Sequence, residues 1–139
     1  RQSGILAMKN LDLQKRLEAF SSGQGRNQEL GTYLEELGLD FRGTRPNGLN
    51  LNGAVIPASN FSGMTLENVD FYGANLGGAN FSGAILKNVD FTKANLDNAN
   101  LTNATVVGGS WFRATCIGAQ VAGLTFSGTN LERTFPQLS

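Results

Sequence analysis

The sequence predicts an all-β solenoid that follows a helical segment. The first observation is a column of apolar residues that recurs every five positions in one unbroken register. The second is the return of glycine or asparagine at one fixed place in each five-residue unit. The third is the loss of this period before about Leu39, where the apolar spacing becomes helical. Internal periodicity of this kind is the signature of a repeat architecture.

The apolar column has nineteen members, and only Pro46 falls outside the apolar set. A second column, two residues earlier, is dominated by alanine, as at Ala74 and Ala79. Two inward residues separated by one outward residue match a very short strand, and alanine avoids overfilling a narrow core. We expect the following residues to form that core: Phe41, Leu51, Ile56, Phe61, Leu66, Phe71, Leu76, Phe81, Leu86, Phe91, Leu96, Leu101, Val106, Trp111, Cys116, Val121, Phe126 and Leu131.

An odd period requires a bend in every repeat, because an unbroken strand would otherwise swap its faces from one unit to the next. Glycine and asparagine tolerate positive φ and stand where this bend is needed, as at Gly73, Gly78 and Asn98. A helix does not fit, because a step of five advances about 500° and spreads the apolar column around the cylinder. The spacing therefore indicates a solenoid that turns once in every five residues.

The central repeats resemble the pentapeptide-repeat family, whose motif is Ala-(Asp/Asn)-(Leu/Phe)-x-x. Four units match it to the letter: Ala74-Asn75-Leu76, Ala79-Asn80-Phe81, Ala94-Asn95-Leu96 and Ala99-Asn100-Leu101. The resemblance implies a right-handed quadrilateral β-helix with twenty residues per coil, and so about five coils here. We expect this β-helix over residues 39–133, a helical cap and linker over 1–38, and a C-terminal tail over 134–139.

The predicted N-terminal cap would cover the unpaired edge that a stacked β-helix exposes at its end. The alternative is that these helices are the tail of a preceding domain. The first helix would bury Leu6, Leu13, Leu17 and Phe20, and residues 21–25 would form a linker. The second would begin at Asn27 and end at Gly38, with Leu30, Tyr33, Leu34 and Leu37 on one stripe. At the other end, Phe135 would act as a lid.

The composition argues against most chemistry. Histidine is absent and there is one cysteine, which removes the commonest general base and the usual zinc motifs. Eleven basic and eleven acidic residues cancel, so no global field favours nucleic acid or an anionic membrane. We therefore expect no enzyme activity, no catalytic residue, no cofactor and no metal, and neither nucleic-acid nor membrane binding.

Two candidates for catalytic chemistry have simpler explanations. Asp70 and Asp90 fall one coil apart, about 5 Å, which is near the separation in retaining glycosidases, but side chains in this column usually tie down turns. Lys87 and Lys93 would pair with these acids. Cys116 occupies a core position, where a cysteine behaves as a small hydrophobic residue.

The outward positions hold the candidate partner-binding residues. The residue after each central one is usually polar, but three consecutive repeats place Val107, Phe112 and Ile117 there, and Tyr72 should share a wall with Phe112. An exposed apolar patch often marks an interface. The alternative is that the C-terminal tail around Phe135 folds back and covers these side chains.

We therefore expect a non-catalytic scaffold that binds an unidentified protein, as a monomer or a weak end-to-end dimer. Since the chain begins at Arg1 rather than methionine, we also expect it to be part of a longer protein. The resemblance leaves both the bacterial cytoplasm and secretion as an effector open. It also implies a rival function, mimicry of DNA against gyrase. Five acids and five bases from Asp40 to Leu131 disfavour that function, as does the lack of room for a C-terminal dimerisation module in the residues that follow.

Overall fold

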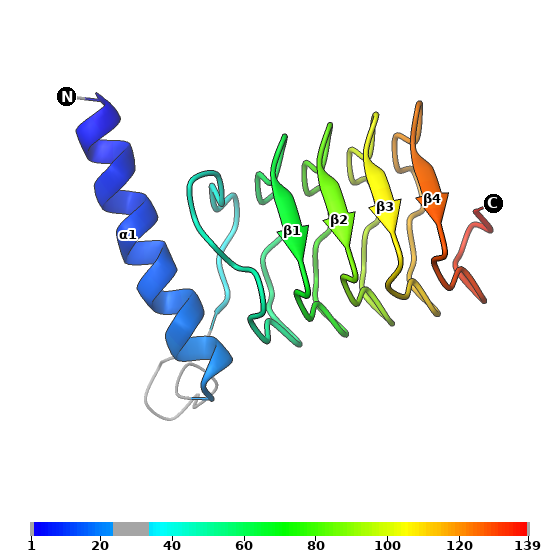
Figure 1. Ribbon diagram of the computed structural model, residues 1–139, viewed down its shortest axis with the longest axis horizontal. Coiled ribbons are helices and arrows are strands. Elements are labelled where there is room, and N and C mark those ends of the chain that lie inside the picture. Colours follow the sequence, from blue (N-terminus) through cyan, green and yellow to red (C-terminus); the bar gives the residue numbers. More distant parts are fainter. Residues whose placement is uncertain (1, 24–33, 139) are drawn as a thin grey trace.

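The computed structural model describes residues 2–23 and 34–138, which form a rod with a helix across one end (Figure 1). The helix α1 spans Gln2–Ser21. The strands are β1 (Thr65–Glu67), β2 (Ile85–Lys87), β3 (Thr105–Val107) and β4 (Thr125–Ser127). They form a parallel sheet in the order β1-β2-β3-β4 along the rod.

This sheet is one of four walls, and every pairing in the rod joins residues twenty positions apart. On the sheet wall Leu66 pairs with Leu86. The other three walls are held by parallel bridges, beginning with Asp40↔Asn60, Asn50↔Asp70 and Glu35↔Val55. The chain is therefore a β-helix solenoid with a twenty-residue, four-sided coil, and this predicted fold class is confirmed.

The corners between walls depend on positive φ and on side-chain hydrogen bonds. Gly73 and Asn68 adopt φ of 64° and 57°, the left-handed region that glycine and asparagine tolerate best. Two repeats after Gly73, the Asn80 Oδ1 accepts a hydrogen bond from the Ser82 N–H at 2.9 Å. The polar column of the sequence therefore closes turns in the manner of an Asx turn.

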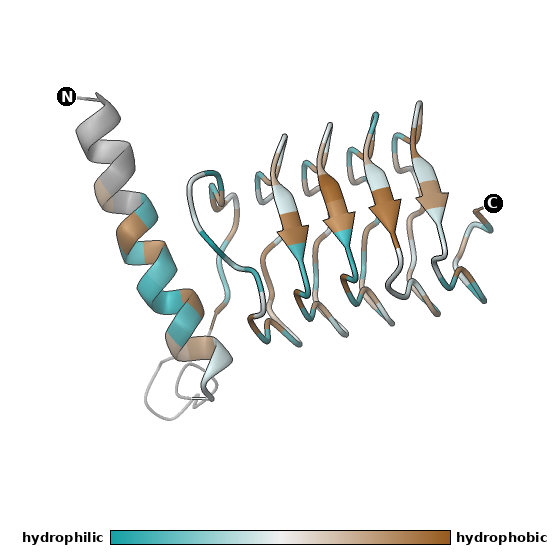
Figure 2. Cartoon of the chain, viewed as in Figure 1, coloured by the Kyte–Doolittle hydropathy of each residue, from teal (hydrophilic) through white to brown (hydrophobic). Residues whose placement is uncertain are grey.

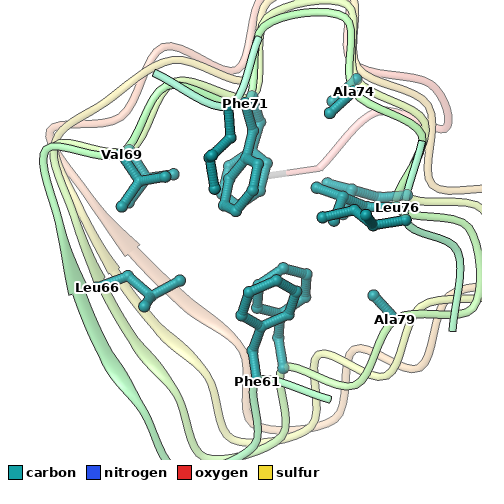
Figure 3. Close-up of a cluster of buried hydrophobic side chains, with 14 of the residues drawn as sticks. Phe61, Leu66, Val69, Phe71, Ala74, Leu76 and Ala79 are labelled. Atoms are coloured by element: carbon teal, nitrogen blue, oxygen red, sulfur yellow. The ribbon is translucent and has the colours of Figure 1, made fainter. Parts of the chain in front are cut away.

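The core is a continuous stack of the apolar column, with each inward side chain directed to the middle of the coil (Figure 3). Members from Phe41 to Cys116 are buried. Phe61 and Phe81 lie parallel with their ring centroids 4.7 Å apart, and Phe81 meets Phe91 edge-on at 5.7 Å. Figure 2 shows the resulting alternation of hydrophilic and hydrophobic positions, repeated from β1 to β4.

The core ends earlier than the apolar column does. Val121 was expected inside but is 42% exposed, and Phe126 and Leu131 are only partly buried. The physical reason is that these residues belong to the last coil, so no further described coil packs over them. The expectation that Val121 is a core residue is therefore wrong.

The N-terminal segment holds one of the two expected helices. In α1 the side chains of Leu13, Leu17 and Phe20 are buried against the first coil, as a cap requires. The second helix is wrong for its described part, because Glu35 pairs with Val55 and Leu37 is 74% exposed. The rest of the expected second helix lies outside the described residues, including Asn27, Leu30 and Tyr33. The same holds for the expected linker residues Gln24 and Gly25 and for the side chain of Leu6.

The C-terminal tail continues the register of the rod. Phe135 bridges to Thr115, and its carbonyl accepts a hydrogen bond from the Cys116 N–H at 2.7 Å. Its side chain is 62% exposed, so the predicted lid is wrong. Pairing thus extends beyond the expected limits of 39–133 at both ends.

Candidate protein-binding surface

The four candidate partner-binding residues lie on three walls of the rod. Tyr72 and Phe112 share the wall that Asp70, Asp90 and Ser110 pair along, two coils apart. Val107 ends β3 on the sheet wall, whereas Ile117 follows Thr115 on the next wall. Because successive repeats occupy successive walls, the residues Val107, Phe112 and Ile117 run around the coil and do not form one flat patch.

These side chains differ in exposure. Tyr72 is 36% exposed, Val107 41% and Ile117 51%, while Phe112 is partly buried. The tail does not cover them through its own aromatic residue, since Phe135 points its ring to solvent. Apolar side chains therefore stand outward on three walls of the C-terminal half of the rod.

The wall that carries Tyr72 and Phe112 is rigidly held at each coil. The Tyr72 N–H donates to Asp70 Oδ1 at 2.8 Å, and the Phe112 N–H donates to Ser110 Oγ at 3.2 Å. Between them, the Thr92 Oγ1 donates to Ser110 Oγ at 3.0 Å. Side-chain hydrogen bonds within each repeat and backbone pairing with the neighbouring coils thus hold the backbone that carries these outward side chains.

Cations lie over the two aromatic rings of this wall. The Lys93 Nζ is 5.6 Å from the centroid of the Tyr72 ring, and the Arg113 Cζ is 5.3 Å from that of Phe112. Contacts of this length fall within the range of a cation–π interaction. The expected pairing of Lys93 with acids is not among the ion pairs of the described residues, and Lys87 pairs with Glu67 at 3.7 Å instead of with Asp70 or Asp90.

The two aspartates of this wall serve its turns. One oxygen of each carboxylate accepts a backbone N–H two residues ahead, Tyr72 for Asp70 and Thr92 for Asp90, both at 2.8 Å. Their backbones are bridged to each other in the parallel ladder. This arrangement is the turn-closing role that the repeat column suggests.

Cys116 is enclosed in the core, with 2% of its surface exposed. Burial raises the pKa of its thiol, and the nearby charge of Asp97 raises that pKa further. Its Sγ lies 3.6 Å from the Phe135 carbonyl. A thiol held in its neutral form away from solvent is a poor nucleophile.

A groove that the sequence did not indicate runs between α1 and the first coil. Its volume is about 610 Å³, and its lining mixes apolar Met8, Leu13 and Leu39 with the Arg16–Glu36 ion pair, whose atoms are 3.3 Å apart. The five-residue column carries no signal for it, since the groove arises from the docking of a helix on a solenoid.

Among the described residues, no group of three or more His, Cys, Asp or Glu side chains is arranged to hold a metal ion. The same part of the chain contains no helix that is both long and apolar enough to cross a membrane.

Uninterrupted five-residue units, four walls and a stacked aromatic core define a β-helical repeat protein. The family model for pentapeptide repeats matches residues 70–106 with eight copies. A pentapeptide-repeat protein from the Arabidopsis thaliana thylakoid lumen is 30% identical over 74% of this chain and 65% of its own, with a TM-score of 0.51. The chain belongs to the pentapeptide-repeat family, and it spans less than two thirds of the plant protein.

Two further solved structures are similar to this chain at lower identity. A pentapeptide-repeat protein from the cyanobacterium Cyanothece 51142 is 19% identical over 63% of this chain and 88% of its own, with a TM-score of 0.39. A trypsin-treated form of QnrB1, a plasmid-mediated fluoroquinolone resistance protein, is 21% identical over 73% of this chain and 72% of its own, with a TM-score of 0.38. No curated protein gives a significant match.

Proposed function

We propose that this chain is a non-catalytic scaffold that binds a protein partner through outward side chains of the rod: Tyr72, Val107, Phe112 and Ile117. Proteins of this family are generally structural or binding modules. The supporting observation is the exposure of Tyr72, Val107 and Ile117 at a repeat position that is usually polar. Single outward apolar side chains are common on protein surfaces, so the proposal gives most weight to Tyr72 and Phe112, two aromatic side chains on one wall, because aromatic residues are enriched in interfaces.

Phe112 is the best candidate for the centre of contact on its wall. It is partly buried, its backbone is held by Ser110, and Arg113 lies beside its ring. Aromatic and arginine side chains held in place are the residues that most often dominate binding energy. A partner that contacts this wall would meet Tyr72 two coils away along the same face.

Mimicry of DNA is the weaker alternative. A rod that replaces DNA in a cationic groove needs a strongly negative surface. The stretch from Asp40 to Leu131 carries five acids and five bases, so it offers no such field. The fold shared with QnrB1 does not change this conclusion, because fold alone does not determine function.

Affinity capture from a lysate of the source cells, compared between variants, tests the proposal. Phe112→Asp should abolish capture of the partner, since a charge would be buried against an apolar contact. Thr102→Asp is the matched control: it occupies the same place in its repeat on the opposite wall, and it should leave capture unchanged. Circular dichroism and melting should show that both variants remain folded.

Two results would count against the proposal. If Phe112→Asp captures the same partner as the unmodified chain, the binding surface is assigned to the wrong wall. If the unmodified rod captures no protein saturably, the scaffold function itself is wrong.

A further inference from the structure

A column of cations follows one corner of the rod. On the Tyr72–Phe112 wall, one corner position lies two residues after the inward apolar residue of each coil. In successive coils this position holds Gly53, Gly73, Lys93, Arg113 and Arg133. Because this wall pairs residues twenty apart, the last three positions stack with a spacing of about 4.8 Å. Lys93, Arg113 and Arg133, which we call the cation ladder, thus extend over about 10 Å at the C-terminal end.

The backbone at the cation ladder is unfavourable for any residue with a side chain. Lys93, Arg113 and Arg133 have φ of 59°, 59° and 57°, in the left-handed region. Gly53 and Gly73 meet the same requirement without strain, and a Cβ at either would have nothing within 4 Å. The corner is therefore open, and glycine would suit it in all five coils.

Stability alone does not explain the cation ladder. Three like charges stacked at this spacing repel one another, and none of them takes part in the ion pairs of the described residues, which are Arg16–Glu36, Arg42–Asp40 and Lys87–Glu67. The neighbouring carboxylates of Asp70 and Asp90 are engaged by backbone N–H groups. The contacts of Lys93 with the Tyr72 ring and of Arg113 with the Phe112 ring bring no opposite charge to the cation ladder, and residues held in a strained backbone tend to cluster where a protein binds something.

We propose that the cation ladder binds an acidic α-helix of a protein partner that lies along the rod; this proposal rests on the scaffold function above. Carboxylates at positions i, i+3 or i+4, and i+7 of a helix share one face and span about 10.5 Å. This length matches the cation ladder. Apolar residues beside such an acidic stripe would contact Phe112 and Tyr72, whose rings already lie beneath Arg113 and Lys93.

A protein helix suits this surface better than nucleic acid does. The chain has no net charge, so it lacks the extended basic field that holds a phosphate backbone. On the same wall Asp90 lies in the coil of Lys93 and Asp70 one coil before it, so a polyanion that continued past the cation ladder towards the N-terminal end would meet these carboxylates. A short acidic stripe can end where the cations end.

The test uses the full chain and a synthetic alanine-based helical peptide with glutamates at i, i+4 and i+7 and a leucine beside them, labelled for fluorescence anisotropy. We expect binding that weakens with added salt. The triple variant Lys93→Gly, Arg113→Gly, Arg133→Gly should bind about tenfold more weakly or not at all. It should also melt at the same or a higher temperature, because glycine relieves the left-handed strain.

Three controls decide the outcome. Two of these controls separate the cation ladder from attraction to any positive charge. The Lys87→Gln variant, which loses a cation of the sheet wall, should bind the acidic peptide normally. A peptide with lysine in place of glutamate should not bind the unmodified chain. Equal binding by the triple variant and the unmodified chain would overturn the proposal, as would tighter binding of a single-stranded thymidine oligonucleotide than of the acidic peptide. If the peptide fails to bind while Phe112→Asp still abolishes partner capture, the cation ladder assignment is wrong but the scaffold function stands.

Discussion

The two ends of the rod face the same problem, an open edge of the β-helix, and meet it differently. At the N-terminal end the Gln14 carboxamide both donates to the Arg45 carbonyl, at 3.0 Å, and accepts from the Arg45 N–H, at 2.7 Å. The Ser21 Oγ accepts from the Asn50 N–H at 2.9 Å. Side chains of α1 thus take the place of the coil that would otherwise precede the first one.

At the C-terminal end no described helix plays this part. Val121 belongs to the same wall and column as Phe41, Phe61 and Phe81, yet it is 42% exposed, whereas the other three are fully buried. The difference shows that a coil is held by neighbours on both sides more than by its own sequence, as expected for a quasi-one-dimensional fold. Identical repeat positions therefore contribute unequally to stability.

The largest expected effect comes from shortening one apolar side chain in the middle of the column, and the comparison is the same change in the last coil. Phe81→Ala should lower the free energy of unfolding by about 3–5 kcal/mol, since it leaves a cavity between stacked rings. Val121→Ala should change it by less than about 1 kcal/mol, because the side chain is already half in water. Urea denaturation followed by circular dichroism measures both, and equal losses would contradict the comparison.

A second test removes the helix-to-edge hydrogen bonds. Gln14→Ala should cost about 1–2 kcal/mol, because it leaves the Arg45 N–H and carbonyl without their side-chain partner at the capped edge. Hydrogen exchange at the Arg45 amide should accelerate. Gln120→Ala is the control at the open edge, where the side chain is exposed, and its effect should stay within about 0.5 kcal/mol. An unchanged Arg45 exchange rate would mean that α1 does not protect this edge.

The sequence was informative wherever the repeat itself carries the structure. The column from Phe41 to Cys116 is buried in the expected register, and only the resemblance to the family supplied the four sides. The start of the rod was missed because Glu36 breaks the apolar column. The companion column continues through Leu34, Leu39 and Thr44, all buried, and would have found it.

The surface was harder to predict than the core. Val107, Phe112 and Ile117 are adjacent in the repeat register, but a square coil sends neighbouring repeats to different walls, so the expected contiguous patch does not form. Side chains on one wall are those twenty residues apart. The twenty-residue spacing of Lys93, Arg113 and Arg133 can be read from the sequence. Their left-handed backbone conformation could be found only from the φ angles of the structure.

The smallest expected effect concerns charge near the capped end. Asp40 and Gln120 stand at opposite ends of one wall, and only Asp40 titrates. Hydrogen bonds from the Arg42 side chain lower the pKa of the Asp40 carboxyl, against the opposing effect of burial. The two contacts are Nη2–Oδ2 at 2.9 Å and Nε–Oδ1 at 3.0 Å.

A carboxyl whose pKa is lower in the folded state stabilises the protein above its unfolded pKa, which is about 3.9 for aspartate. That stabilisation is lost as the pH falls through the lower, folded pKa. The melting temperature of Asp40→Asn should therefore lie slightly below that of the unmodified chain at pH 6, and the gap should close on acidification below about pH 4. Arg42→Gln should show the same closing gap, because it removes the cause of the shift. A melting-temperature gap that stays constant down to pH 2 would contradict this prediction. It would show that the charge of the Asp40 carboxylate does not stabilise the folded chain.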